Sequence, residues 1–487
     1  MAEEYISDRL KIKLEQSIID SHLTMEILLK YNKGDFDHIK AVKAEGFPPV
    51  DNKRIINMTG EVSYSIPSQK LTEKLKKFRI SLPQLSTDEN KDVLLSEKEL
   101  TEIGKQLMSC YSFGILNGGS ATSYADSKKN RSFNPDLFDQ LREPFELLSE
   151  ASRGRAKGIT PAFINPDGTV GPSFIELKMR ALLINDCPSM FQMTSYFNDE
   201  SIGKTYKKYE NSPYLKDLIE KKDNNICRVK TGIQPLLAAF TQSCAGEKKT
   251  LFETSDGSLL PIPGGHGQCF ITLKKVFTDL YQSGVRFISI GNVDNIGYTP
   301  EPVSLAILAL SGKPAGFDFS YKTPVDVKGG ILIRDERGHL NCADLGVAID
   351  NKAVEEAERQ GTSILFNCAT GLFNLEYLVN NIDWIINSLP MRFSDQDKDA
   401  GKYSQAEQVT WEVIGLLDDI LIFAINKYER FLAAKTIMEN LMTSGLELGE
   451  SINEDLKSTA TELNKGLVKK LKNTYGLKLE KGRWIPV

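Results

Sequence analysis

The sequence contains few of the side chains that build metal clusters or disulfide frameworks. Its 487 residues include four histidines and seven cysteines, and no two cysteines form a C-x-x-C pair. The cysteines stand singly along the chain, at Cys110, Cys187, Cys227, Cys244, Cys269, Cys342 and Cys368. This spacing argues against a structural zinc site or a disulfide framework, and it favours a reducing compartment.

Long apolar runs are also missing. No stretch approaches the roughly 18–20 uninterrupted apolar residues that a membrane span needs. The first residues, MAEEYISDRLKIKLEQ, include several acidic side chains and lack the apolar core of a secretory signal. We therefore expect a cytoplasmic protein without a membrane partner.

A strong excess of charge of either sign is absent as well. The formal net charge is −5, so no general electrostatic attraction draws the chain to nucleic acid or to acidic lipid. An anionic ligand must instead be held by individual lysines and backbone amides. We expect small molecules rather than nucleic acid as partners, and the sequence leaves the oligomeric state open.

The remaining composition is that of an ordinary globular protein, with 41% hydrophobic and 26% charged residues. The length allows two or three domains. Helical spacing dominates both ends of the chain, and short apolar runs dominate the middle. We expect a helical N-terminal region over 1–105, an α/β domain over 106–390 and a mainly helical region over 391–487.

The middle region alternates short apolar runs with helical segments. GILNGG, RALLIND, RFISIGN and SILFNCA have the character of buried strands, whereas GQCFITLKKVFTDLYQSG has helical spacing. This alternation predicts a largely parallel sheet with ligands at the carboxyl ends of its strands. After Pro390, the run EQVTWEVIGLLDDILIFAINKYERFLAAKTIMENLM is interpreted as a long helical stretch broken near Arg430.

The stretch that organises the chain is ILNGGSATSYA, residues 115–125. It has the pattern of a buried strand that breaks into a glycine turn and opens onto a helix. Gly118 and Gly119 let the backbone approach a ligand closely, and its N–H groups can point at an anion. A Gly-Gly pair after a strand is also ordinary turn chemistry. A phosphate site is favoured only because four later stretches, 261–268, 291–297, 324–333 and 430–435, suit the same ligand.

Five polar side chains in or near these stretches are candidates for binding or catalysis. Lys157, in a glycine-flanked loop, can place its ammonium on a phosphate or can be an ordinary exposed lysine. His266 lies between glycines and is either a donor presented to a ligand or a structural histidine. Asp294 follows a strand and suits Mg²⁺, or it caps the next turn. Lys328 and Lys435 stand in mostly apolar sequence, where a buried lysine needs a carboxylate or a substrate phosphate.

The polar segment 126–155 separates the glycine turn from Lys157. It contains a helical pattern around 136–151 and is interpreted as an insertion over the site. A lid and a plain surface excursion remain equally open interpretations.

Several ordered motifs resemble those of the UTP–glucose-1-phosphate uridylyltransferase family, also called UDP-glucose pyrophosphorylases. ILNGG resembles the family's LNGG loop, AKG its lysine-bearing GPK or PKG segment, and FQMTS its M-x/T-S strand. PGGHG resembles PPGHG, GNVDN resembles NSDN or VDN, and DVKGGILI resembles DVKGGTLI. QVT followed by RFLAAKTIMENLM resembles Q-x-E-T and RFLPVKTTSDLL. Because these matches keep their order from 115 to 442, they are more specific together than any one motif.

The resemblance implies a Rossmann-like, GT-A-like nucleotidyltransferase domain. It implies that a sugar 1-phosphate oxygen attacks the α-phosphorus of UTP, most simply giving UDP-glucose and pyrophosphate, with Mg²⁺ as cofactor and Asp294 as its ligand. The implied nucleotide-binding residues are Leu116, Asn117, Gly118, Gly119, Met193, Gly264 and Gly265. The implied sugar-phosphate-binding residues are His266, Asn292 and Asn367, and the implied catalytic residues are Lys157, Lys328 and Lys435.

The chain departs from the family pattern where the base and the sugar are recognised. LNGGSATSYA lacks two glycines of LNGGLGTSMG, and the uracil-reading glutamine aligns with Thr231, three residues before Gln234. Gln268 replaces an aspartate, and Ala369 and Thr370 replace asparagines. Two interpretations follow: an active uridylyltransferase, or a family member that has lost catalysis and binds sugar nucleotides or acts as a scaffold. The retained lysines and aspartate favour the enzyme.

Overall fold

The structure is a computed structural model. It describes residues 7–36, 42–82, 92–187, 189–221, 228–243, 247–323, 326, 329–346, 348–398 and 400–487.

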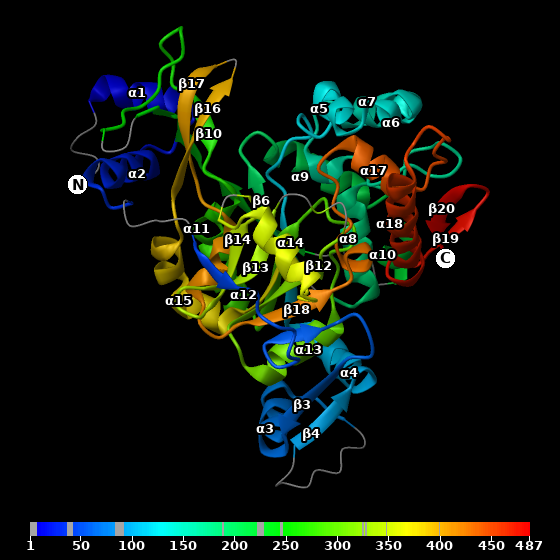
Figure 1. Ribbon diagram of the computed structural model, residues 1–487. Helices are drawn as coiled ribbons and strands as arrows, with labels where there is room; N and C mark the ends of the chain where they lie inside the picture. Colours follow the sequence, from blue (N-terminus) through cyan, green and yellow to red (C-terminus); the bar gives the residue numbers. More distant parts are fainter. Residues whose placement is uncertain are drawn as a thin grey trace.

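An 11-stranded sheet forms the centre of the molecule (Figure 1). Its main path is β2 (Ile55–Asn57), β18 (Leu421–Ile425), β12 (Ala315–Tyr321), β15 (Leu365–Asn374), β11 (Phe287–Asn292), β5 (Tyr111–Leu116), β6 (Ser189–Ser195) and β7 (Arg228–Gln234). Three more strands extend from β15, namely β13 (Gly330–Asp335), β14 (Leu340–Asp344) and β1 (Ala44–Gly46). Along the main path only β15 is antiparallel to its neighbours. The predicted α/β class with a mostly parallel sheet is confirmed.

The parallel strands bring their carboxyl ends to one edge of this sheet. The register places Leu116 of β5 beside Asn292 of β11 and Met193 of β6. It also places Ser195 at the end of β6 beside Gln234 at the end of β7. Residues distant in sequence therefore lie in neighbouring positions where α/β sheets bind ligands.

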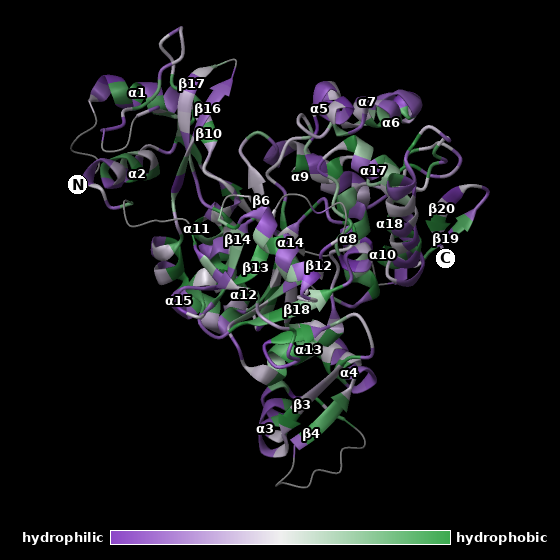
Figure 2. Cartoon of the chain, viewed as in Figure 1, coloured by the Kyte–Doolittle hydropathy of each residue, from purple (hydrophilic) through white to green (hydrophobic). Residues whose placement is uncertain are grey.

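Helices cover both faces of the sheet. One face packs against α4 (Glu97–Leu107), α8 (Phe174–Ile184), α13 (Pro302–Ser311) and α18 (Glu454–Asn473). The other face packs against α11 (Cys269–Thr272), α12 (Lys274–Gln282) and α15 (Leu375–Ser388). Helix α13 is apolar along its length and is green in Figure 2. A helix with this composition is stable only when it is surrounded by the core.

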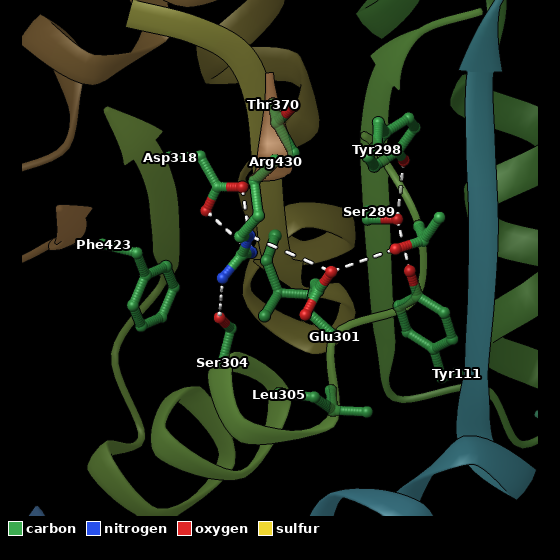
Figure 3. A pocket seen from close by; sticks show the side chains of 12 residues that line it. Tyr111, Ser289, Tyr298, Glu301, Ser304, Leu305, Asp318, Thr370, Phe423 and Arg430 are labelled. Atoms are coloured by element: carbon green, nitrogen blue, oxygen red, sulfur yellow. Dashed lines mark hydrogen bonds and ion pairs between the residues drawn. The ribbon is translucent and has the colours of Figure 1, made fainter. Parts of the chain in front are cut away.

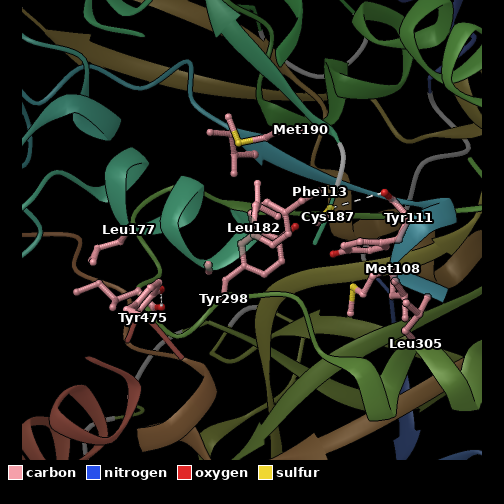
Figure 4. Packing of buried hydrophobic residues seen from close by; sticks show 14 of the residues in the cluster. Met108, Tyr111, Phe113, Leu177, Leu182, Cys187, Met190, Tyr298, Leu305 and Tyr475 are labelled. Atoms are coloured by element: carbon pink, nitrogen blue, oxygen red, sulfur yellow. Dashed lines mark hydrogen bonds between the residues drawn. The ribbon is translucent and has the colours of Figure 1, made fainter. Parts of the chain in front are cut away.

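Aromatic packing fixes the strand that leads into the glycine turn. Phe113 of β5 stacks on Tyr298, with 4.3 Å between ring centroids and 21° between ring planes. Leu182 of α8 and Met190 of β6 lie in the same cluster (Figure 4). The Tyr298 hydroxyl donates to the Gly114 carbonyl at 2.8 Å, so β5 is held by both packing and a hydrogen bond.

Smaller elements surround the sheet. The strands are β3 (Ser63–Pro67) with β4 (Asp92–Ser96), β8 (Leu236–Ala238) with β10 (Pro261–Pro263), β9 (Phe240–Thr241) with β17 (Gly401–Glu407) and β16 (Arg392–Lys398), and β19 (Leu477–Glu480) with β20 (Arg483–Pro486). The helices are α1 (Asp8–Gln16), α2 (Ser21–Lys33), α3 (Ser68–Phe78), α5 (Ser127–Phe133), α6 (Pro135–Gln140), α7 (Arg142–Ser152), α9 (Asp199–Tyr209), α10 (Lys216–Lys221), α14 (Asn351–Arg359), α16 (Lys427–Arg430) and α17 (Ile437–Ser444). No helix within the described ranges combines the length and the apolar content needed to cross a bilayer.

Two predicted elements have the wrong type. RALLIND, predicted as a strand, belongs mostly to α8, and LIFAI within the predicted long helix forms β18. LIFAI is fully buried and RALLIND is buried over 180–183, and periodicity cannot distinguish a strand from a helix in such short apolar runs. The capping box of Ser173 and Glu176 marks the start of α8 and was the available sequence signal.

The terminal regions are helical only in part. Strands β2 and β18, from the two ends of the chain, pair in parallel and join the central sheet. The sheet therefore takes strands from all three expected regions, whose boundaries at 105 and 390 remain a prediction.

The close approach of α4 to α13 depends on Gly104. An added Cβ at Gly104 would lie 2.0 Å from the backbone oxygen of Pro302, whereas an added Cβ at Gly203 in α9 meets no atom within 4 Å. We expect Gly104→Ala to lower the free energy of unfolding by about 1–3 kcal/mol. Gly203→Ala is the matched control and should raise it by about 0.5–1 kcal/mol. Urea unfolding measures both, and equal effects would contradict the close approach.

Candidate functional site

An open cavity of about 610 Å³ lies at the carboxyl edge of the sheet. The loops after β5, β6 and β11 line it, together with the β10 loop and the segment before α17. It brings together most of the predicted site residues, namely Leu116, Gly118, Gly119, Lys157, Met193, Gly265, His266, Asn292, Asp294 and Lys435.

Four predicted residues fall outside this lining or outside the described chain: Asn117, Gly264, Lys328 and Asn367. Asn117 is fully buried behind it, and its Nδ2 donates to Gln192 Oε1 at 3.2 Å. The Gly264 N–H donates to Gln268 Oε1 at 3.1 Å, so Gly264 holds the loop together. Lys328 lies outside the described residues.

Asn367 lies near the same edge of the sheet but does not line the cavity. Its Oδ1 accepts the Ala369 N–H at 2.9 Å and closes a local turn. Ala369 has φ of 48°, a left-handed conformation that alanine rarely adopts. In this structure Asn367 therefore supports the backbone of its own strand.

Lys157 is the central side chain of the cavity. Its ammonium forms an ion pair with Asp294 and donates to the Ala434 carbonyl at 2.6 Å. It also lies 5.0 Å from the Tyr124 ring centroid, and its backbone N–H donates to the Gly119 carbonyl at 3.1 Å. An ammonium has three donors. Two are used by described residues, so among these one is left for a ligand.

Asp294 has the features of a shared metal ligand. Its side chain is 13% exposed, and Oδ1 has no hydrogen-bond partner within the part of the chain that the structure describes. No group of three or more His, Cys, Asp or Glu side chains able to hold a metal occurs among those residues. Mg²⁺ is commonly bound by one or two carboxylates together with substrate phosphates. The single carboxylate with a free oxygen fits that mode of binding.

His266 is a neutral hydrogen-bond donor. Burial lowers the pKa of its imidazole from 6.5 to about 4. Its Nδ1 accepts the backbone N–H of Thr410 at 3.1 Å. Because a backbone N–H can only donate, this contact assigns the ring proton to Nε2.

The sequence matches a known protein family. The model of the family described as UTP–glucose-1-phosphate uridylyltransferase matches residues 193–476, more than half of the chain. The chain belongs to this uridylyltransferase family. The family predicted from the ordered motifs is therefore confirmed.

Two curated relatives match over part of their length. A probable UTP–glucose-1-phosphate uridylyltransferase of Schizosaccharomyces pombe is 24% identical over 251 residues, which cover 48% of this chain and 46% of the relative. A UTP–glucose-1-phosphate uridylyltransferase of Encephalitozoon cuniculi is 30% identical over 95 residues, 19% of each protein. The chain thus spans less than half of each of these relatives.

Solved structures share the fold. The UDP-glucose phosphorylase of Trypanosoma brucei has a TM-score of 0.55 at 16% identity, covering 92% of this chain and 79% of that chain. The uridine diphosphate N-acetylglucosamine pyrophosphorylase of the same organism has a TM-score of 0.59 at 14% identity, covering 97% and 83%. At these identities the likeness shows the fold alone.

Gln234 lines the cavity but was not predicted as a site residue, because it lies three residues after the position that aligns with the family glutamine. Thr231, which aligns with the family glutamine, is exposed and accepts from Gln192 Nε2 at 3.0 Å. Gln234 instead lines the cavity and is 6% exposed. The sequence signal was its place at the end of a strand, since only strand ends reach the binding edge.

The amide of Gln234 has a fixed orientation. Its Nε2 donates to the Gly265 carbonyl at 2.7 Å and to Gln268 Oε1 at 2.8 Å. Its Oε1 therefore lies on the side of Gly118, 3.3 Å from the position of an added Cβ there. Gln268, the replacement for the family aspartate, thus orients Gln234 as an acceptor.

A second missed residue is Lys129, which lies in the segment 126–155. It lines the cavity, and its ammonium donates to the Ser123 hydroxyl at 3.0 Å. The segment forms α5, α6 and α7. Helices α6 and α7 pack an apolar cluster against α17, with Leu137 and Leu148 fully buried, and Asn130 of α5 accepts the Met438 N–H at 2.9 Å. Lys129, Lys157 and Lys435 oppose the single carboxylate of Asp294 in the cavity wall, so the wall favours an anion.

The lowered pKa of His266 has a consequence for stability. Because the folded pKa of about 4 lies below the ordinary value of 6.5, the stability due to neutral His266 is present above pH 6.5 and is lost as the pH falls toward 4. The loss between pH 7 and pH 5 is about 2 kcal/mol. We expect His266→Gln to remove this part of the pH dependence. Urea unfolding of both proteins at the two pH values measures it, and equal losses would show that His266 is not buried in its neutral form.

Proposed function

We propose that the chain transfers the uridylyl group of UTP to a sugar 1-phosphate, releasing pyrophosphate and forming a UDP-sugar. One observation carries this proposal. A single cavity has an oriented amide acceptor at one end and three lysines with one carboxylate at the other. Glucose 1-phosphate is the favoured acceptor, and N-acetylglucosamine 1-phosphate is the second, because structures named for either sugar share the fold.

The base end of the cavity suits uracil. The side-chain amide of Gln234 already uses both of its N–H groups, so the atom that it offers to a ligand is the acceptor Oε1. Uracil offers N3–H to such an acceptor, whereas cytosine has only a lone pair at N3. Leu116 and Met193 supply the apolar walls against which the flat base packs. The backbone of Gly118 approaches closely because it has no side chain.

The phosphate end suits a triphosphate. Lys157 retains one free N–H, and Lys129 and Lys435 add positive charge in the same wall. Asp294 would hold Mg²⁺ jointly with the phosphates, and that ion supplies further neutralisation of phosphate charge when bound.

The reaction needs positioning and charge neutralisation more than covalent help from the protein. A phosphate oxygen of the sugar 1-phosphate forms a bond to the α-phosphorus of UTP. The bond from that phosphorus to the bridging oxygen of the β-phosphate breaks, and pyrophosphate leaves with the electron pair. His266 donates Nε2–H and Asn292 donates its amide N–H to the incoming sugar phosphate. Lys157 and Lys435 stabilise the charge that develops on the phosphoryl oxygens.

The assignment of Gln234 is tested by base selectivity. Gln234→Leu removes the acceptor and should raise the Kd for UMP at least tenfold, with much less preference for UMP over CMP. Thr231→Ala is the matched control because Thr231 does not line the cavity, and it should bind UMP normally. Calorimetric titration measures both. Loss of binding in Thr231→Ala alone would place the base-reading group at the aligned position instead.

The phosphate end is tested by kinetics. Lys157→Ala, Asp294→Asn and Lys435→Ala should each lower kcat/KM for pyrophosphate release at least 100-fold. Lys129→Ala should lower it less than Lys157→Ala, because Lys129 is exposed whereas Lys157 is partly buried. Lys128→Ala, on the neighbouring residue outside the cavity wall, is the control and should leave it unchanged. Full activity in the first three variants would refute the proposed site.

The function itself is tested by pyrophosphate release with Mg²⁺ from UTP, ATP, GTP, CTP and dTTP against a panel of sugar 1-phosphates. We expect turnover with UTP, fastest with glucose 1-phosphate, and none in the presence of EDTA. Binding of UDP-sugars without any turnover would support the alternative favoured by the altered glycine loop, a sugar-nucleotide-binding or scaffold protein.

A further inference from the structure

A buried charged cluster lines a second, smaller pocket (Figure 3). The guanidinium of Arg430 donates to both carboxylate oxygens of Asp318, at 3.1 and 2.9 Å, and to the Ser304 hydroxyl at 3.2 Å. The side chains of Arg430 and Asp318 are only 14% and 8% exposed. Glu301 lies 4.0 Å from the guanidinium and accepts from Lys470 at 3.0 Å.

The cluster joins four separate elements. Arg430 ends α16, Asp318 is in the middle of β12, Ser304 is in the first turn of α13, and Lys470 is on α18. Burial raises the pKa of Asp318 to about 6, although the charge of Arg430 acts in the opposite direction. Removing either partner alone would leave an uncompensated buried charge or donor, which is strongly unfavourable.

The backbone at Arg430 is bound to the loop that carries Asp294. Asn295 Nδ2 donates to the Arg430 carbonyl at 3.1 Å, and Asn295 Oδ1 accepts the Leu432 N–H at 2.9 Å. The Ile296 N–H donates to the Leu432 carbonyl at 3.0 Å. An added Cβ at Gly297 would lie 2.5 Å from the carbonyl carbon of Arg430, so only glycine fits there. The two segments therefore pack backbone to backbone.

The segment after Arg430 and the loop with Asn295 each contain a residue that lines the cavity, only a few positions away along the chain. Asp294 precedes Asn295 directly, and Ala434 and Lys435 follow Leu432 by two and three positions. Lys157 bridges them, since its ammonium contacts both Asp294 and the Ala434 carbonyl. The place of Arg430 in the core thus determines where the segment with Lys435 meets the loop with Asp294.

We propose that Arg430 is a positioning residue for phosphoryl transfer: its ion pair with Asp318 holds Ala434 and Lys435 in place against Lys157 and Asp294. Arg430 itself does not line the large cavity and touches no substrate. This inference rests on the proposed function, because it assigns the phosphates to the lysine end of the cavity.

The competing explanation is that the ion pair serves stability alone. The two roles can be separated, because a buried ion pair can often be replaced by apolar side chains of similar volume without loss of stability. Arg430→Met combined with Asp318→Leu makes this replacement. It keeps the backbone hydrogen bonds of 430–432 and removes the fixed geometry of the guanidinium fork.

The experiment compares Arg430→Met, Asp318→Leu and the double variant with the wild-type protein. We expect the single variants to have a lower Tm and the double variant to recover most of it. In the double variant kcat should remain at least tenfold below wild type, while KM for UTP changes less than threefold, because the base end is untouched. A double variant that recovers kcat together with Tm would overturn the positioning role.

Arg180→Met is the matched control. Arg180 is 2% exposed and pairs with Asp217, and neither residue lines the cavity. Its loss should lower Tm but leave kcat of the folded protein within twofold of wild type. A tenfold fall in kcat for Arg180→Met would show that any loss of a buried arginine impairs turnover, and it would overturn the specific role of Arg430.

Binding provides a readout that does not depend on turnover. Titration with pyrophosphate and with uridine probes the two ends of the cavity separately. We expect the double variant to bind pyrophosphate at least tenfold more weakly and uridine normally. If the wild-type protein binds pyrophosphate without turnover, the proposed function fails while this test still decides the positioning role. Wild-type protein that binds no pyrophosphate, or a double variant that binds it normally, would overturn the inference.

Discussion

The ion pair between Lys157 and Asp294 is the contact on which the rest of the site depends. It joins residues 137 positions apart, and the hydrogen bond from the same ammonium to Ala434 spans 277 positions. Three segments from the middle and the end of the chain therefore meet at one positive charge. Because a partly buried ammonium needs compensating partners, the loops that carry those partners are held together even without a ligand.

The sheet imposes the other constraint. Its parallel strands place Leu116, Met193 and Asn292 in one row, and Gln234 beside Ser195 at the same edge. The end of the cavity that we propose for the base is thus built on strand ends, whereas the end proposed for the phosphates is built on loops joined by ionic contacts. We propose that the buried pair of Arg430 and Asp318 supports these loops from the core. Charge neutralisation is effective only in a fixed geometry, so the proposed function needs both kinds of support.

The sequence predicted the sheet class, the family and about half of the residues that line the cavity, because glycine turns and polar residues at strand ends have strong local patterns. It failed where local pattern and tertiary environment diverge. RALLIND and LIFAI were assigned the wrong type because burial of most of their residues removes the periodicity of exposed and buried positions. Gln234 was missed because the alignment pointed to Thr231, and only the strand register shows which side chain faces the cavity. Lys129 was missed because its position depends on the packing of α5 to α7 against α17.

The most direct test of the account is a crystal structure of the protein with a non-hydrolysable UTP analogue and Mg²⁺. The account predicts that uracil N3–H lies within hydrogen-bond distance of Gln234 Oε1 and that a phosphate oxygen lies within hydrogen-bond distance of Lys157 Nζ. A nucleotide bound in the reverse direction, or with its phosphates away from Lys157, Asp294 and Lys435, would contradict it.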